Sequence, residues 1–213
     1  MLNISVYRIL LVFLTSLTMF GSASCGSSDS AGPTVPSKIF VTAGSFTGDL
    51  VTEEGSGKAN GILAADALCM SDANYPGTGT YKALIVDGAN RVASVTANAG
   101  DGQVDWVLKP NTNYSRSDGT TLIMTTDANA IFVFGTLNNG FENTHHPYWS
   151  GLNDDWTATP DTPFDQHCNG WAYGGATAPY GVFGYTDGTD STAIHWSGSA
   201  YCSNIMNLVC VQQ

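Results

Sequence analysis

Short apolar segments separated by long polar stretches make up most of this chain. Residues 38–43 (KIFVTA) and 81–86 (YKALIV) predict β-strands, and the second is closed by a turn at Asp87-Gly88. Residues 131–134 form an apolar run that we expect to be buried, and residues 148–152 (YWSGL) and 207–211 (NLVCV) are further strand candidates. The strands predicted by this pattern are therefore few and short.

One helix is predicted in the first third of the chain. Asn60 is a typical N-cap residue, and the helix must end before Pro76. The apolar residues that follow the cap at helical spacing are Ile62, Ala65, Leu68 and Cys69. Long stretches rich in Gly, Asn, Asp and Thr separate these elements. We therefore expect an α+β fold with few short strands, one or two helices and long loops.

The first 24 residues have the parts of a secretion signal. Arg8 is the only charged residue in this segment, and an apolar core at residues 9–20 follows it. This core is too short to span a bilayer. The small residues 21–24 then precede Cys25. We interpret residues 1–24 as a signal peptide and expect an exported protein.

Cys25 is expected to carry a lipid. Small residues precede it, as a lipoprotein signal requires, and lipidation explains an odd fifth cysteine in an exported chain. Cleavage after Ser24 without lipidation is the alternative. Residues 25–37 contain almost no apolar surface and two prolines, so they predict a flexible tether. The expected location is the outer membrane or cell surface, with a periplasmic or secreted protein as the alternative.

The composition is acidic. The 213 residues include 7 Lys and Arg against 18 Asp and Glu, for a net charge of −11. Because Arg8 is the only charge in the leader, the chain from Cys25 onward carries −12. Such a charge repels phosphate backbones and anionic lipids, so we expect no nucleic-acid partner and no membrane contact except through an N-terminal lipid. Residues 38–213 are enough for one domain.

Several phrases of this sequence resemble a known fold. A helix ending in Cys69, the segment at residues 148–152 followed by Trp156, and the ending at residues 208–211 resemble the C-type-lectin-like fold, endostatin included. The runs that carry a closer resemblance are residues 105–112 (DWVLKPNT), 148–153 (YWSGLN) and 208–212 (LVCVQ). These are similar to the endostatin-like lipoproteins of spirochaetes such as Leptospira, whose function is largely uncharacterised. The resemblance covers residues 38–213.

The four later cysteines suit a disulfide-stapled domain in an oxidising compartment. Four cysteines allow three pairings, and their spacing does not choose among them. In the C-type-lectin-like fold the helix cysteine pairs with the last cysteine, and the middle two pair with each other. The resemblance therefore implies Cys69–Cys210 and Cys168–Cys202.

The sequence lacks the motifs of calcium-dependent sugar binding. Glu-Pro-Asn, Gln-Pro-Asp and Trp-Asn-Asp triplets supply the oxygen ligands in C-type lectins, and this chain has none of them. We interpret residues 153–155 and 187–190 as solvated turns rather than as ion sites. The only cluster that suggests zinc is His145, His146 and His167, which we interpret as histidines of a polar loop. We expect no metal site and no cofactor.

No catalytic motif is complete. Residues 55–58 (GSGK) fail as a phosphate loop because Ala59 replaces the required Ser or Thr. The chain also lacks G-x-S-x-G and H-E-x-x-H. Cys168 follows His167, but a disulfide-bonded cysteine is not a nucleophile. We therefore expect no catalytic residue and no enzyme.

Aromatic residues crowd the second half of the chain. Trp149 is expected in the core. The candidate ligand-binding loop, between the middle two cysteines, contributes Trp171, Tyr173, Tyr180 and Tyr185. Tyr and Trp give large contact area at low entropic cost, which is typical of recognition surfaces. The alternative is that these residues form a small satellite core that orders the loop.

Three functions are compatible with these features. The resemblance implies a lipid-anchored envelope protein that binds host extracellular-matrix, plasma or complement proteins. The acidic composition favours a partner with a basic surface. A calcium-independent carbohydrate-binding module that uses aromatic stacking is the first alternative, and a structural envelope protein without a host role is the second.

Overall fold

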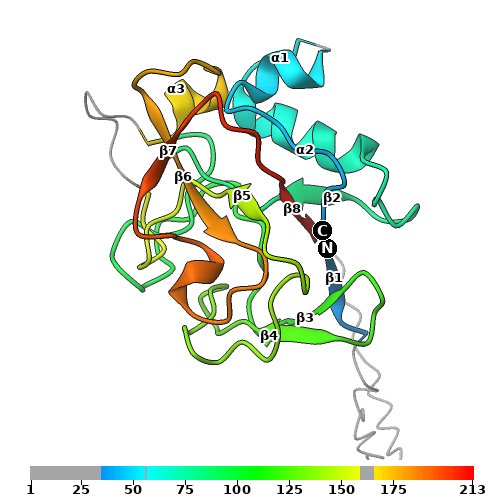
Figure 1. The fold of residues 1–213 in the computed structure, drawn as a ribbon. Helices are drawn as coiled ribbons and strands as arrows, with labels where there is room; N and C mark the ends of the chain where they lie inside the picture. The colour runs from blue at the N-terminus through cyan, green and yellow to red at the C-terminus, as the bar shows by residue number, and fades with distance from the viewer. Residues whose placement is uncertain (1–34, 56, 159–165) are drawn as a thin grey trace, which may run out of the picture. The chain divides into compact units, whose positions relative to one another are not determined.

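Strand pairing between the two ends of the domain organises the larger of its two sheets. The computed structural model describes residues 35–55, 57–158 and 166–213, so the expected signal peptide, Cys25 and residues 25–34 of the expected tether lie outside the described part. The sheet has the order β2-β8-β1-β3-β4. Its strands are β1 (Ser37–Val41), β2 (Tyr81–Ala83), β3 (Asn113–Arg116), β4 (Leu122–Thr125) and β8 (Val209–Gln212). β1 lies antiparallel to β8 and parallel to β3 (Figure 1).

The smaller sheet comes largely from the segment expected to be a long loop. Its order is β5-β6-β7, all antiparallel. The strands are β5 (Pro147–Trp149), β6 (Tyr180–Tyr185) and β7 (Ser199–Tyr201). A 3-10 turn, η1 (Ser191–Ala193), lies between β6 and β7. The chain between the middle two cysteines is therefore partly a β-structure, which corrects the expectation of a long irregular loop.

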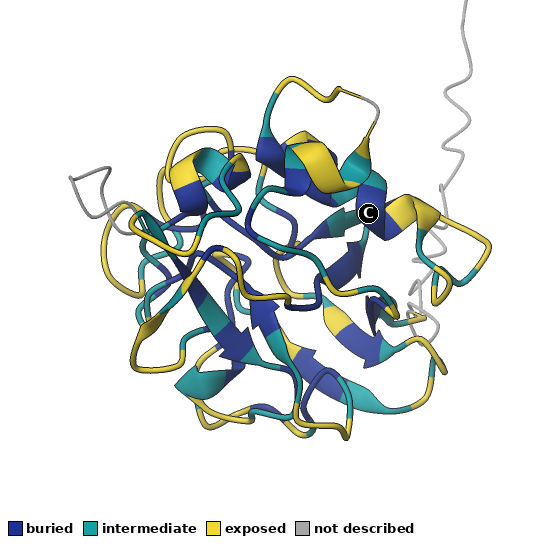
Figure 2. Cartoon of the chain, turned by 45° about the horizontal axis from the view of Figure 1, so that its top comes forward, coloured by how far each residue is buried: buried dark blue, intermediate teal, exposed yellow. Residues whose placement is uncertain are grey.

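The larger sheet separates two apolar clusters. Ile39 and Val41 of β1 point into one cluster, which also contains Tyr148 and Trp156. Phe40, between them in sequence, points into the other cluster, on the side of the helices. This alternation follows from the period of two in a strand. Figure 2 shows the strands largely buried, whereas the connecting loops are mostly exposed.

The predicted helix is confirmed as α2 (Gly61–Ser71). The Asn60 side chain accepts a hydrogen bond from the backbone N–H of Leu63 at 2.9 Å, as an N-cap does. All four apolar residues predicted on its inner face are buried. A short helix that was not predicted, α1 (Leu50–Glu54), precedes it and is capped by Asp49.

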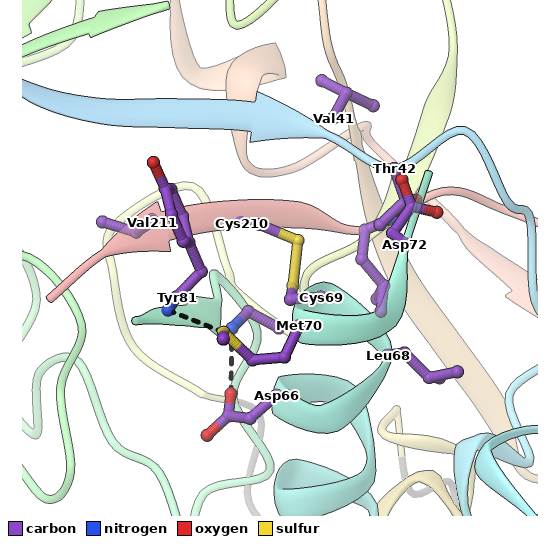
Figure 3. The surroundings of a disulfide bond; sticks show 12 residues. Val41, Thr42, Asp66, Leu68, Cys69, Met70, Asp72, Tyr81, Cys210 and Val211 are labelled. Atoms are coloured by element: carbon purple, nitrogen blue, oxygen red, sulfur yellow. Dashed lines mark hydrogen bonds between the residues drawn. A yellow bond between two sulfur atoms is a disulfide. The ribbon is translucent and has the colours of Figure 1, made fainter. Parts of the chain in front are cut away.

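Side chains of α2 cover the free edge of β2. The backbone N–H of Tyr81 donates to Met70 Sδ at 3.2 Å, and that of Ala83 donates to Asp66 Oδ1 at 2.9 Å (Figure 3). An uncovered strand edge invites pairing with another chain. These two bonds close the edge at β2.

Three of the predicted strands are shorter than expected or shifted. Pairing of residues 81–86 ends at Ala83, after which the chain crosses toward the smaller sheet, where Val86 N–H donates to Ser150 O at 2.8 Å. Residues 148–152 pair only as far as Trp149, because Gly151 has a φ of +69°. The strand expected at residues 207–211 is β8, two residues later at its start.

The apolar run at residues 131–134 forms no strand. Its first two residues are buried as expected, whereas Val133 is exposed. These apolar residues are buried without strand pairing, because the backbone hydrogen bonds of this region form turns such as the one at Asp127.

The element α3 (Cys168–Trp171) is a single turn of left-handed backbone. Its residues have φ values of +48°, +54°, +65° and +63°. A left-handed conformation costs roughly 1–2 kcal/mol for each residue that carries a Cβ. Tertiary contacts must therefore hold this turn. Trp171 provides one of them, because its indole N–H donates to Val86 O at 2.8 Å in the core.

Four glycines allow this turn to pack closely. A Cβ at Gly61 would lie 2.3 Å from Trp171 Cβ, and a Cβ at Gly48 would lie 2.4 Å from Cys168 Sγ. A Cβ at Gly151 would lie 3.0 Å from Trp171 Cζ2, and a Cβ at Gly181 would lie 2.9 Å from Cys168 Sγ. Atoms in folded proteins do not approach this closely without a shift of the backbone or side chains. The turn thus lies in a socket formed by these four glycines, and a larger residue at any of the four would clash with it.

Gly61→Ala should destabilise the fold by about 1–3 kcal/mol, the usual cost of overpacking a filled site. The added methyl group would meet backbone atoms of Gly170 and Trp171, which cannot rotate away. Gly198→Ala is the matched control, since an added Cβ there meets nothing within 4 Å. Urea unfolding of both variants measures the difference. Equal stability of the two variants would contradict the socket.

Two disulfides join the helices to the sheets. Cys69 of α2 is bonded to Cys210 of β8, with Cα atoms 5.8 Å apart (Figure 3). Cys168 of α3 is bonded to Cys202, just after β7, with Cα atoms 5.7 Å apart. Both separations are ordinary for disulfides. This nested pairing is the one that the resemblance implied.

A fully buried arginine links α2, β2 and the loop that follows β2. The Arg91 side chain is 0% exposed, and it donates to both Asp66 carboxylate oxygens at 2.9 and 2.7 Å and to Asp105 Oδ2 at 2.6 Å. It also donates to Ala83 O at 2.7 Å. Burial disfavours the guanidinium charge, but the bonds and charges of the two carboxylates outweigh it and raise the pKa of Arg91.

Many of the acidic residues close turns. Asp101 accepts from the backbone N–H and the hydroxyl of Thr96 at 2.8 and 2.9 Å, and these bonds lower its pKa to about 2. Asp118 accepts in the same way from the hydroxyl and N–H of Thr121, which lowers its pKa. Part of the acidic composition is thus structural, because Asp side chains order long loops by bonding to the backbone.

Candidate functional site

The four aromatic residues proposed for one ligand-binding loop do not share one surface. Trp171 is fully buried and packs against Trp149, with ring centroids 5.6 Å apart. A direct role of Trp171 in ligand contact is therefore wrong, and the core alternative holds for this residue. Trp149 is buried as predicted. Tyr173 is half-buried against the helix-side cluster, and its hydroxyl lies 2.7 Å from Thr177 Oγ1.

Tyr180 lies at the start of β6 beside an exposed tyrosine of β7. Tyr180 and Tyr201 are directly opposite in the strand pairing, and their ring centroids are 5.3 Å apart. Tyr201 is 49% exposed, whereas Tyr180 is half-buried. The half-buried ring supports the exposed one, as expected of cross-strand aromatic pairs.

Tyr185 lies at the other end of β6 beside an exposed tryptophan. Its ring centroid is 5.2 Å from that of Trp196, which is 44% exposed. The imidazole of His145 stacks on the same Tyr185 ring, with ring centroids 3.9 Å apart. We call Tyr180–Tyr201 and Tyr185–Trp196 the aromatic pairs of β6.

The sequence interpretation did not single out Trp196 or Tyr201 as ligand contacts. Both lie in a short Ser- and Gly-rich segment, residues 196–201 (WSGSAY). Trp171 also lies near a glycine and is fully buried, so no local signal in the sequence separates it from Trp196.

A pocket opens where β1 and β3 separate. Pairing of the two strands ends at Ile39 and Arg116, while β1 continues to Val41. The pocket has a volume of about 430 Å³. It is lined by Ile39, Phe40, Val41, Asn74, Arg116, Ser117, Phe141, Glu142, Asn143 and Thr144. We call it the β1–β3 pocket.

Hydrogen bonds fix the polar side chains of the β1–β3 pocket. Arg116 donates from Nε and Nη2 to Gly140 O, at 3.0 and 2.9 Å, and from Nη1 to Asn143 Oδ1 at 2.7 Å. Asn74 Nδ2 donates to Val41 O at 2.9 Å. Glu142 Oε1 lies 2.7 Å from His146 Nδ1. The wall of the pocket at residues 141–144 is therefore held in place by Arg116 of β3 and by His146, the residue before β5.

The three histidines considered for zinc each contact a different partner. His145 pairs with Asp187 at 2.9 Å, and His146 pairs with Glu142. His167 is buried, with Nε2 3.1 Å from Gly151 O. Within residues 35–55, 57–158 and 166–213, no three or more His, Cys, Asp or Glu side chains are grouped as a metal would require.

The two acidic segments considered for calcium form turns. Asp155 accepts from the N–H of Thr157 at 3.0 Å. Asp190 caps η1 by accepting from the hydroxyl of Thr192 at 2.5 Å and from its N–H at 2.9 Å, and these two bonds lower the pKa of Asp190. These contacts fit the interpretation of both segments as turns.

Residues 52–189 match the model of a family described as "Protein of unknown function (DUF1554)". The chain belongs to this family. The DUF1554 match includes α2, β6 and residues 141–144 of the β1–β3 pocket, together with β4 and β5 on either side of those residues. It leaves out β1 and everything after residue 189, which includes η1, β7, β8, Trp196 and Tyr201. No curated protein matches the chain. None of the helices in the described part of this DUF1554 protein is long and apolar enough to cross a membrane.

Proposed function

We propose that this DUF1554 protein is an exported recognition module that binds a host extracellular-matrix, plasma or complement protein through the aromatic pairs of β6. The observation that carries the proposal is the exposure of Trp196 and Tyr201, each supported by a half-buried tyrosine. Tyr and Trp dominate the binding energy of many protein interfaces, because a rigid ring loses little entropy when it is covered.

The net charge of the chain limits the kind of partner surface that it favours. The net charge of −11 favours encounter with a basic surface and opposes an acidic one. Asp187 lies beside the Tyr185–Trp196 pair through its contact with His145. A basic side chain of the partner can therefore meet a carboxylate beside the Tyr185–Trp196 pair.

Trp196→Ala and Tyr201→Ala should each weaken binding of the partner at least tenfold, as loss of an anchoring aromatic ring does. The assay is surface plasmon resonance against a panel of purified extracellular-matrix, plasma and complement proteins. Val95→Ala removes an exposed apolar side chain elsewhere and is the control. The proposal fails if no protein of the panel binds, or if both aromatic variants bind as the wild type does.

The proposed module is C-type-lectin-like and anchored at the cell surface by a lipid on Cys25. The nested disulfides, one of which joins the end of α2 to the last strand, support the lectin-like assignment. Residues 1–34 lie outside the described part, so the lipid anchor rests on the sequence pattern alone.

Cys25→Ser should move the protein from the membrane fraction to a soluble exported form, because a lipoprotein signal places the lipid on the thiol of this cysteine. Fractionation and immunoblotting of cells that express each form measure the shift. Recovery of the wild type in the periplasm or the medium would reject the anchor.

A further inference from the structure

We propose that the β1–β3 pocket is a binding site for a neutral saccharide of one or two rings. The proposal uses other residues than the aromatic pairs of β6 and goes beyond the proposed protein ligand. At about 430 Å³, the pocket has the size of small-molecule sites. Its lining comes from β1, from Arg116 and Ser117 at the end of β3, from residues 141–144 and from Asn74.

The polar groups of the pocket suit hydroxyl groups. A guanidinium has five N–H donors, and the contacts of Arg116 with Gly140 and Asn143 engage three of its nitrogens in a fixed orientation. The remaining N–H groups can donate to a ligand. The Glu142 carboxylate keeps acceptor capacity beside its contact with His146. Sugar hydroxyls both donate and accept, so donors and acceptors fixed side by side match adjacent hydroxyls.

Charge favours a neutral ligand. The pocket is lined by one guanidinium and one carboxylate, so its formal charge is zero. The field of the acidic chain opposes anions such as phosphates or acidic sugars. A lone cation would meet the guanidinium of Arg116. A polyhydroxyl compound has no such penalty.

The apolar residues that line the pocket offer little side-chain surface to a ligand. Ile39, Val41 and Phe141 are at most 6% exposed and belong to the core. The accessible surface of the pocket is therefore mainly polar, which suits the hydroxyl rim of a saccharide better than an apolar ligand.

The test compares Ser117→Trp with Thr120→Trp. Ser117 is exposed and lines the pocket, whereas Thr120 is exposed on the same turn and does not line it. Wild type should bind a neutral mono- or disaccharide on a glycan array and in calorimetric titration, with no change when EDTA is added. Ser117→Trp should weaken that binding at least tenfold, and Thr120→Trp should leave it unchanged.

A second variant guards against misfolding of the first. Glu142→Gln keeps the size of the side chain, and it should also weaken saccharide binding at least tenfold while the melting temperature stays near that of the wild type. Trp196→Ala should retain saccharide binding, which separates this site from the proposed protein-binding surface. The proposal is overturned if only acidic glycans or extended peptides bind, if no glycan binds, or if Ser117→Trp binds like wild type.

Discussion

Arg91→Met should lower the free energy of unfolding by about 3–5 kcal/mol, the usual cost of removing one partner from a buried ion pair. The variant leaves the Asp66 carboxylate, 15% exposed, without its cation at a position where the guanidinium is 0% exposed, whereas Asp105 keeps its ion pair with Lys82. It also removes the bond to Ala83 O, which fixes the end of β2. Urea unfolding at neutral pH measures the loss.

A triple variant separates the effect of the unpaired carboxylate from the effect of lost packing. In the triple variant Arg91→Met, Asp66→Asn, Asp105→Asn, no buried charge lacks a partner, so part of the stability should return. Lys109→Met removes an exposed cation and should change stability by less than about 0.5 kcal/mol. A loss below about 1 kcal/mol for Arg91→Met would show that the network is solvated and structurally unimportant.

Reduction of both disulfides should lower the melting temperature by well over ten degrees. The Cys69–Cys210 bond spans 141 residues and the Cys168–Cys202 bond spans 34. By the chain-entropy model these closures stabilise the fold by about 4–5 and 3–4 kcal/mol. One kcal/mol corresponds to roughly 2–4 °C for a domain of this size. Calorimetry with and without reductant measures the shift.

Paired substitutions should rank the two bonds. Replacing Cys69 and Cys210 by alanine should cost more than replacing Cys168 and Cys202, because the longer loop regains more entropy in the unfolded chain. Identical melting curves in reductant and in buffer would contradict a stabilising role for either bond.

Local signals were sufficient for α2. Asn60, the apolar spacing and the requirement to end before Pro76 all act within one element, so the helix follows from the sequence. β3 has no such signal. Its sequence, NYSR, is largely polar, and it becomes a strand because β1 and β4 pair with it. Tertiary pairing of this kind is invisible to periodicity.

The same distinction explains the outcome at the candidate site. Trp171 and Trp196 both lie near glycines, and only the fold decides that Trp171 fills a socket formed by Gly61 and other distant glycines. The β1–β3 pocket was also beyond sequence reasoning. Arg116 bonds to a carbonyl 24 residues away, and β1 contributes the opposite wall. No local pattern brings such residues together.

One of the nested disulfides holds α2 to β8 of the larger sheet, and the other holds α3 to the end of β7 in the smaller sheet. Peptide mapping of the unreduced protein by mass spectrometry is the most direct test of this arrangement. The structure predicts two linked peptide pairs, Cys69 with Cys210 and Cys168 with Cys202. Crossed links such as Cys69 with Cys168, or free thiols at these positions, would contradict it.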